Sequence, residues 1–180
     1  MSKSDDALKK AIDELNLDPI KIKIMDKEEG LGWTANQVDE AEKFYKRFLF
    51  LSAKYPKQPL VPTKHIDAFW HWHILDTQKY SADCISVFGV FLHHFPYFGK
   101  RGNDTKVWQN SISETDNLNE QHFRESAHKL DELFKDSGDN VYPNCFTPGC
   151  AACGSTDRVP QPQLRPSLPN NALNTSHAWF

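Results

Sequence analysis

The sequence predicts an all-α fold, a single compact multi-helix domain that carries an irregular C-terminal tail rich in Pro and Cys. Apolar residues recur at the three- and four-residue spacing of amphipathic helices, and only the short stretch 20–24 alternates with a period of two. Six of the eleven prolines lie in residues 143–169, among Ser, Asn and Gln. We therefore expect a helical core domain over residues 1–137 and an irregular tail over residues 138–180.

The first helix is expected over residues 5–15, where three apolar residues share one helical face. Asp18-Pro19 should break this helix, because proline removes a backbone donor and restricts the residue before it. The segment from this break to Trp33 is therefore expected to be a connector.

Three longer helices are expected in the middle of the chain. Thr34 opens a capping-box pattern, and aromatic residues then recur at helical spacing until Pro56, which predicts one long core helix. After a Pro-rich loop, Thr63 is expected to cap the next helix. A third should run from about Gln78 and stop before Pro96. The strongest apolar stripes predict one buried cluster, made of Tyr45, Phe48, Trp70, Tyr80 and Phe88.

Composition and charge exclude several classes of protein. The formal net charge of −3 and the pI of about 6.2 provide no basic face for nucleic acid or anionic lipid. The chain has no run of 18 apolar residues, and its first residues are polar where a signal peptide would be apolar. We therefore expect a cytoplasmic protein with neither nucleic acid nor a membrane as its partner.

Histidines are concentrated in one segment of the chain, where five of the eight lie from His65 to His94. Neutral imidazole is a common ligand of zinc, iron and copper, so a dense histidine cluster beside an aspartate predicts a transition-metal site. The candidate ligands in this segment are Asp67, His71, His73, His94 and Cys84.

Helix geometry divides these candidates between two sides of one helix. Asp67 and His71 are four residues apart and share a face, whereas His71 and His73 point about 160° apart. One ion cannot easily bind both histidines from a straight helix. We therefore expect Asp67 and His71 to act together, and His73 to face the opposite side, toward Cys84 or toward His94 at the end of the following helix.

The same residues allow an interpretation without metal. Asp67 could hydrogen-bond an indole or an imidazole, which would make the motif a polar element of helix packing. Cys84 lies on an apolar stripe and is expected either to be a core cysteine or to be a thiolate ligand or nucleophile paired with His73.

A second group of candidate ligands lies in the tail. Cys145, Cys150 and Cys153 surround a Pro-Gly turn, which suits thiolates that wrap around a zinc ion. A closed zinc site needs a fourth ligand, which could be Cys84, one of the histidines or His177. The alternative is a patch of unligated or partly oxidised thiols.

The histidine segment also carries a recognisable pattern. Its residues are Asp67, Trp70, His71 and His73, followed by Tyr80 and Cys84, and they spell Asp-x-x-Trp-His-x-His and then Tyr-x-x-x-Cys. On this pattern the chain resembles the glycine-rich domain-containing proteins, in particular their short bacterial members, over residues 10–135. It lacks the glycine-rich tail of the long plant members. The resemblance implies that the polar residues of the motif belong together, and it implies no particular reaction.

We interpret the chain as a metal-binding helical protein with a His/Asp(/Cys) centre in the 65–94 region. The expected cofactor is a divalent transition metal, zinc or iron, with copper as a further option. Either the protein is a metal-dependent enzyme, or it is a non-catalytic interaction or structural module whose tail binds zinc or a partner. No phosphate loop, dinucleotide fingerprint or nucleophile elbow identifies a substrate. The expected partner is a small molecule or a peptide, and the tail is expected to dock on the core or on that partner.

Overall fold

The computed structural model describes residues 4–99 and 104–135, and it confirms the all-α fold. Within these residues the chain forms helices and no strand, and none of the helices is long and apolar enough to cross a membrane. The helices are α1 (Asp5–Asp13), α2 (Asp18–Met25), α3 (Ala35–Lys54), α4 (Lys64–Leu75), α5 (Thr77–Phe88), α6 (Thr105–Phe123) and α7 (Lys129–Glu132). The predicted tail, residues 138–180, lies outside the described residues, so the predicted division into core and tail stays a prediction.

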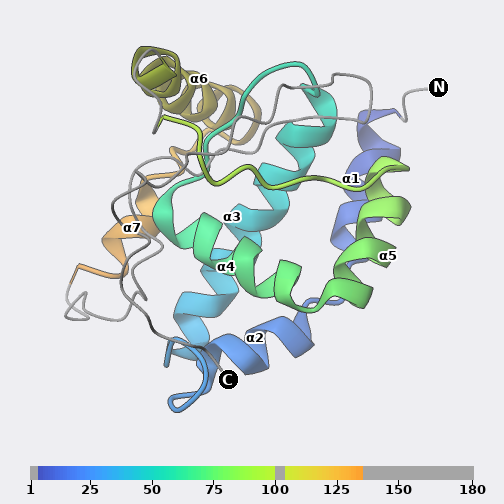
Figure 1. The fold of residues 1–180 in the computed structure, drawn as a ribbon, viewed down its shortest axis with the longest axis vertical. Helices are drawn as coiled ribbons and strands as arrows, with labels where there is room; N and C mark the ends of the chain where they lie inside the picture. The colour runs from blue at the N-terminus through green and yellow to red at the C-terminus, as the bar shows by residue number, and fades with distance from the viewer. Residues whose placement is uncertain (1–3, 100–103, 136–180) are drawn as a thin grey trace, which may run out of the picture.

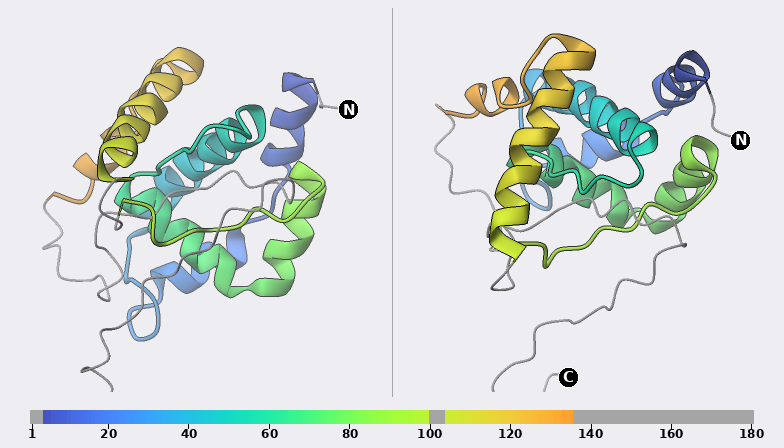
Figure 2. Two further views of the ribbon diagram at one scale, coloured as in Figure 1. Left: turned by 45° about the horizontal axis from the view of Figure 1, so that its top comes forward. Right: turned by 90° about the horizontal axis from the view of Figure 1, so that it is seen from above.

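Helix α3 lies at the centre of the molecule and contacts α1, α2, α4, α6 and α7 (Figure 1). Helices α1 and α5 contact each other along one side, and α5 follows α4 after a single intervening residue. Helix α6 lies on the other side of α3, away from α1 and α5 (Figure 2). The consecutive pair α4 and α5 is therefore held against the central helix, and this pair carries most of the histidine segment.

The core is built around large aromatic side chains from α3, α4 and α5. Tyr45, Phe48, Trp70 and Tyr80 each expose no more than 1% of their surface. The rings of Phe48 and Trp70 lie 5.3 Å apart between centroids, which links α3 to α4. The predicted aromatic cluster is confirmed for these four residues, while Phe88 packs against the core only partly buried.

Two helices begin at the residues that the sequence predicts. The Gln37 backbone N–H donates to Thr34 Oγ1 at 3.3 Å, and the Thr34 N–H donates to Gln37 Oε1 at 2.9 Å. This reciprocal pair is the expected capping box at the start of α3. Thr63 is the N-cap residue of α4, although its side chain makes no capping hydrogen bond.

The predicted connector before Trp33 is wrong, because it contains α2. Asp18-Pro19 begins this helix and does not end the previous one. Proline is well tolerated in the first turn of a helix, where its missing N–H would have no partner in the helix anyway. Ile20 and Ile24 are both buried, four residues apart, so the apolar residues here follow the helical period and not a strand.

The prediction that His94 lies at the end of the helix carrying Cys84 is also wrong. Helix α5 ends at Phe88, and Gly89 follows in the left-handed conformation with φ 74°. A glycine in this conformation is a common helix terminator, because it lacks the Cβ atom that would be strained there. The chain then runs on without helical structure, and His94 lies in that segment.

Candidate metal centre

The structure brings together three potential ligands from two segments of the chain. Asp67 and His71 lie on α4, and His94 comes from the segment after α5. One ligand atom from each residue lies within 4.8 Å of the other two. His94 Nε2 is 3.2 Å from Asp67 Oδ1, and His71 Nδ1 is 3.6 Å from Asp67 Oδ2.

Local structure explains how these three side chains meet. Asp67 and His71 are separated by four residues of helix, so they lie on the same face one turn apart. His94 reaches them because Gly89 ends α5 and releases the chain to pass beside α4. The imidazole of His94 lies 4.5 Å from that of His71 between ring centroids, and it also contacts the indole of Trp70 at 4.6 Å.

The three side chains of the cluster differ in how far they are exposed. The side chains of Asp67 and His94 expose 4% and 9% of their surface, whereas that of His71 exposes 32%. Burial lowers the pKa of His71 below its usual value of 6.5, although the Asp67 carboxylate acts in the opposite direction. His71 is therefore held in the neutral form, which is the form that binds a metal ion.

The spacing of the three groups is compatible with a shared metal ion, and it also includes a hydrogen bond between His94 Nε2 and Asp67 Oδ1. Metal–nitrogen bonds of about 2.0–2.1 Å place neighbouring ligand atoms roughly 2.8–3.4 Å apart for bond angles of about 90–110°. The Asp67 to His94 distance falls in this range, and the His71 to Asp67 distance lies just above it. At 3.6 Å that second pair is too long for a hydrogen bond. Asp67 and His71 therefore do not satisfy each other.

His73 lies apart from this cluster and belongs to a second polar group inside the core. Its Nε2 lies 2.9 Å from Asp83 Oδ2, and its Nδ1 lies 2.9 Å from the Tyr45 hydroxyl. A carboxylate only accepts, so Nε2–H donates to Asp83, and Nδ1 then accepts from Tyr45. Burial lowers the pKa of His73 and raises that of Tyr45, so both groups stay neutral.

The contact between His73 and Asp83 was not predicted from the sequence. Asp83 stands one position before Cys84 on α5, and its other partner is Lys79, whose Nζ lies 2.8 Å away. A Lys and an Asp four residues apart on a helix are normally read as a surface pair. Only the packing of α4 against α5 shows that the carboxylate also faces a buried histidine.

The predicted thiol ligands are not part of the Asp67 cluster in the described residues. Cys84 is buried, and burial raises its pKa, which disfavours the thiolate form that binds metals. Cys145, Cys150 and Cys153 lie outside the described residues. Their predicted role in zinc binding therefore stays a prediction.

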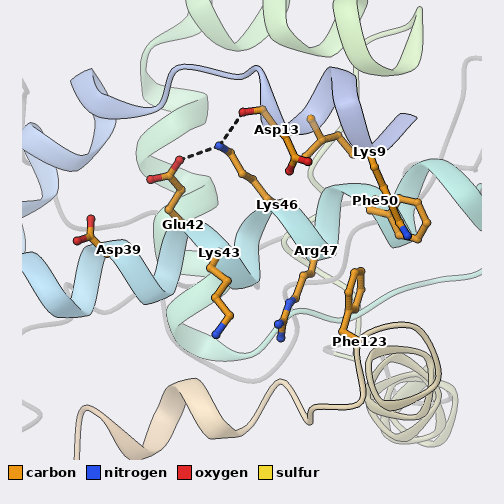
Figure 3. Close-up of a pocket in the computed structure, with 10 residues that line it drawn as sticks. Lys9, Asp13, Asp39, Glu42, Lys43, Lys46, Arg47, Phe50 and Phe123 are labelled. Atoms are coloured by element: carbon orange, nitrogen blue, oxygen red, sulfur yellow. Dashed lines mark hydrogen bonds and ion pairs between the residues drawn. The ribbon is translucent and has the colours of Figure 1, made fainter. Parts of the chain in front are cut away.

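A hollow of about 590 Å³ lies between α1, α3 and the end of α6 (Figure 3). Figure 3 shows Lys46 reaching between Glu42 and Asp13. Its Nζ lies 2.9 Å from Glu42 Oε1 and 3.3 Å from the Asp13 backbone oxygen. Arg47 is paired with Glu125 at 2.7 Å. These two cations are matched within the fold, so we place the candidate site at the Asp67 cluster and not in this groove.

Fold and site together define an all-α protein with a candidate Asp/His metal centre. Residues 8–130 match the UCP032817-like family, and because this match covers more than half of the sequence, the chain belongs to that family. The resemblance to glycine-rich domain-containing proteins is therefore wrong, since the matching family is a different one. No curated protein and no solved structure matches the chain.

Proposed function

We propose that this protein binds one divalent transition-metal ion through Asp67, His71 and His94. The observation that carries the proposal is the convergence of a buried carboxylate and two imidazoles, in which His94 hydrogen-bonds Asp67 and His71 Nδ1 lies 3.6 Å from the same carboxylate. Two histidines and one carboxylate form a ligand set typical of non-haem iron, and three protein ligands are also typical of catalytic zinc.

The exposure of His71 supports a site that keeps a position for an exogenous ligand. Three protein ligands leave at least one coordination position of a zinc or iron ion for water or a small molecule. The partly exposed imidazole lies on the side from which such a ligand would enter. An ion bound in this way would lower the pKa of a coordinated water molecule. It would also act as a Lewis acid on a small-molecule or peptide substrate.

The burial of Asp67 and His94 favours a second candidate, a structural ion. Such an ion would fasten the segment after α5 to the face of α4 and would have no exchangeable ligand. Azide added to the cobalt-loaded protein distinguishes the two functions. A shift of the visible absorption bands on addition of azide supports the open site, and unchanged bands support the structural ion.

The test of metal binding is a Co²⁺ titration of the full chain purified without an affinity tag. Cys145, Cys150 and Cys153 are replaced by serine in every sample, so that thiolates cannot compete for the ion. We expect one ion per chain and no thiolate charge-transfer band. His71→Ala and Asp67→Asn each alter a proposed ligand and should each weaken binding by more than about 100-fold, because even residues that only orient a ligand contribute about 10–100-fold.

His128→Ala is the matched control, because His128 is an exposed histidine outside the cluster. This variant should bind Co²⁺ as the parent does. Equal affinity in the parent and His71→Ala, or no binding by the parent, would reject the proposed site.

A further inference from the structure

We infer that Tyr80 is a positioning residue for His94, because its hydroxyl holds the main chain of Leu92, two residues before His94. The inference rests on the proposed metal site and assigns a role to the tyrosine of the Tyr-x-x-x-Cys pair. Tyr80 does not itself belong to the Asp67, His71 and His94 group.

The Tyr80 hydroxyl holds Leu92 through its backbone carbonyl group. The Tyr80 hydroxyl donates to the Leu92 carbonyl oxygen at 2.6 Å. Burial raises the pKa of the Cys84 thiol, and a hydrogen bond with the Leu92 backbone acts in the opposite direction. Tyr80 and Cys84 are four residues apart on α5, so they form one edge along which the returning chain is fixed.

Trp70 connects this contact to the site. Its Nε1–H donates to the Tyr80 oxygen at 2.8 Å, and its ring contacts the His94 imidazole edge to face at 4.6 Å. Trp70 is also the residue before His71 on α4. The same indole therefore orients the hydroxyl that holds Leu92 and the imidazole that reaches Asp67.

Because Leu92 is only two residues from His94, the position of Leu92 determines where the His94 imidazole can lie. An extended chain advances about 3.3 Å per residue, so two residues cover roughly 6–7 Å. His94 Nε2 must come within about 3 Å of Asp67 for a shared ion, and a shift of the chain at Leu92 would be passed on to the imidazole almost directly. Leu92 is itself buried, which leaves the segment little freedom to slide.

Charge does not contribute to this arrangement. Burial raises the pKa of Tyr80 far above its usual value of 10.0, and burial likewise raises the pKa of Cys84. Both side chains stay protonated at neutral pH, so Tyr80 acts as a hydrogen-bond donor and Cys84 as a neutral thiol.

The test compares two variants that each remove one buried tyrosine hydroxyl, Tyr80→Phe and Tyr45→Phe. Both tyrosines are almost completely buried, but the Tyr45 hydroxyl bonds His73 and not Leu92. In the Co²⁺ titration of the full chain, Tyr80→Phe should lower affinity about 10–100-fold and shift the visible bands, while Tyr45→Phe should stay within about twofold of the parent. Equal affinities for both variants would overturn the positioning role.

Hydrogen exchange of the metal-free protein separates this inference from the proposed metal site. Tyr80→Phe should accelerate exchange of the amides in residues 91–95 at least tenfold, and Tyr45→Phe should not. If the parent bound no Co²⁺, the proposed function would fail, and exchange alone would decide the positioning role. Unchanged exchange in Tyr80→Phe would overturn it whether or not metal binds.

Discussion

Two histidines of α4, only two residues apart, occupy opposite chemical environments. His73 lies in the core, where Tyr45 and Asp83 satisfy both of its ring nitrogens. His71 is partly exposed, and its carboxylate neighbour Asp67 is too distant for a hydrogen bond. The difference shows that the number of histidines in a motif does not decide how many bind metal. The partners already supplied by the fold decide it.

The contrast extends to the groups around each histidine. The polar group around His73 joins α3, α4 and α5, because Tyr45, His73 and Asp83 come from three different helices. The group around His71 joins α4 to a non-helical segment through His94. The first group therefore links three helices through hydrogen bonds, while in the second His94 hydrogen-bonds Asp67 and His71 lies just beyond hydrogen-bond distance of that carboxylate.

Trp70→Ala should have the largest effect, because Trp70 serves both regions at once. The residue is fully buried, donates to Tyr80 and contacts His94. Truncation of a buried tryptophan typically lowers the free energy of unfolding by about 3–5 kcal/mol. Urea denaturation of metal-free protein measures this loss. A loss below about 1 kcal/mol would show that Trp70 is not part of the core.

His73→Ala and His71→Ala should separate the two regions by their effect on stability. His73→Ala removes a buried partner of Tyr45 and Asp83, which should lower the free energy of unfolding by about 1–3 kcal/mol. His71→Ala should change it by no more than about 0.5 kcal/mol in metal-free protein, as is usual for a partly exposed residue without a structural role. Matching losses in the two variants would contradict the distinction.

The change in stability with pH should be smaller than these losses, and His71 and His122, whose pKa values burial also lowers, should contribute to it alongside His73. Burial lowers the pKa of His73 in the folded state below the value of 6.5 expected when unfolded. The unfolded chain therefore binds more protons as the pH falls below 6.5, so stability is complete above this pH and decreases on acidification. The decrease should be at most about 1.4 kcal/mol per pH unit for each such histidine.

Urea denaturation at pH 7.5 and pH 5.5, in the presence of a chelator, tests this dependence. Glu42, whose pKa is also lowered in the folded state, titrates in the unfolded chain near 4.5 and affects stability mainly below that window. The slope between the two pH values should be reduced in His73→Ala. An unchanged slope in that variant would show that His73 does not titrate differently in the folded and unfolded states.

The helical period was sufficient to predict most of the fold. The capping box at Thr34 predicted where α3 begins, and the four-residue spacing placed Asp67 beside His71 on one face of α4. Asp18-Pro19 was misread because proline favours both the end of one helix and the first turn of the next. Nothing within that dipeptide distinguishes the two.

The rest of the site could not be predicted because it depends on tertiary packing. His94 was assigned to a helix because the apolar pattern continues past Gly89, and only the left-handed glycine shows where α5 ends. Asp83 faces His73 because α4 packs against α5. The spacing of residues along the sequence does not reveal this packing. The resemblance to another family rested on individual motif residues within residues 10–135, and such residues alone do not identify a family.

The division of roles between His71 and His73 is tested most directly by thermal unfolding with and without Co²⁺. The parent, His71→Ala and His73→Ala are compared in the background that lacks the three tail cysteines. An ion at about 100 times its dissociation constant stabilises the folded state by about 2.7 kcal/mol, which raises the unfolding temperature by several degrees. We predict that His73→Ala unfolds at a lower temperature but keeps this increase, and that His71→Ala unfolds near the parent without metal but loses it. An increase that persists in His71→Ala, or that disappears in His73→Ala, would contradict the division.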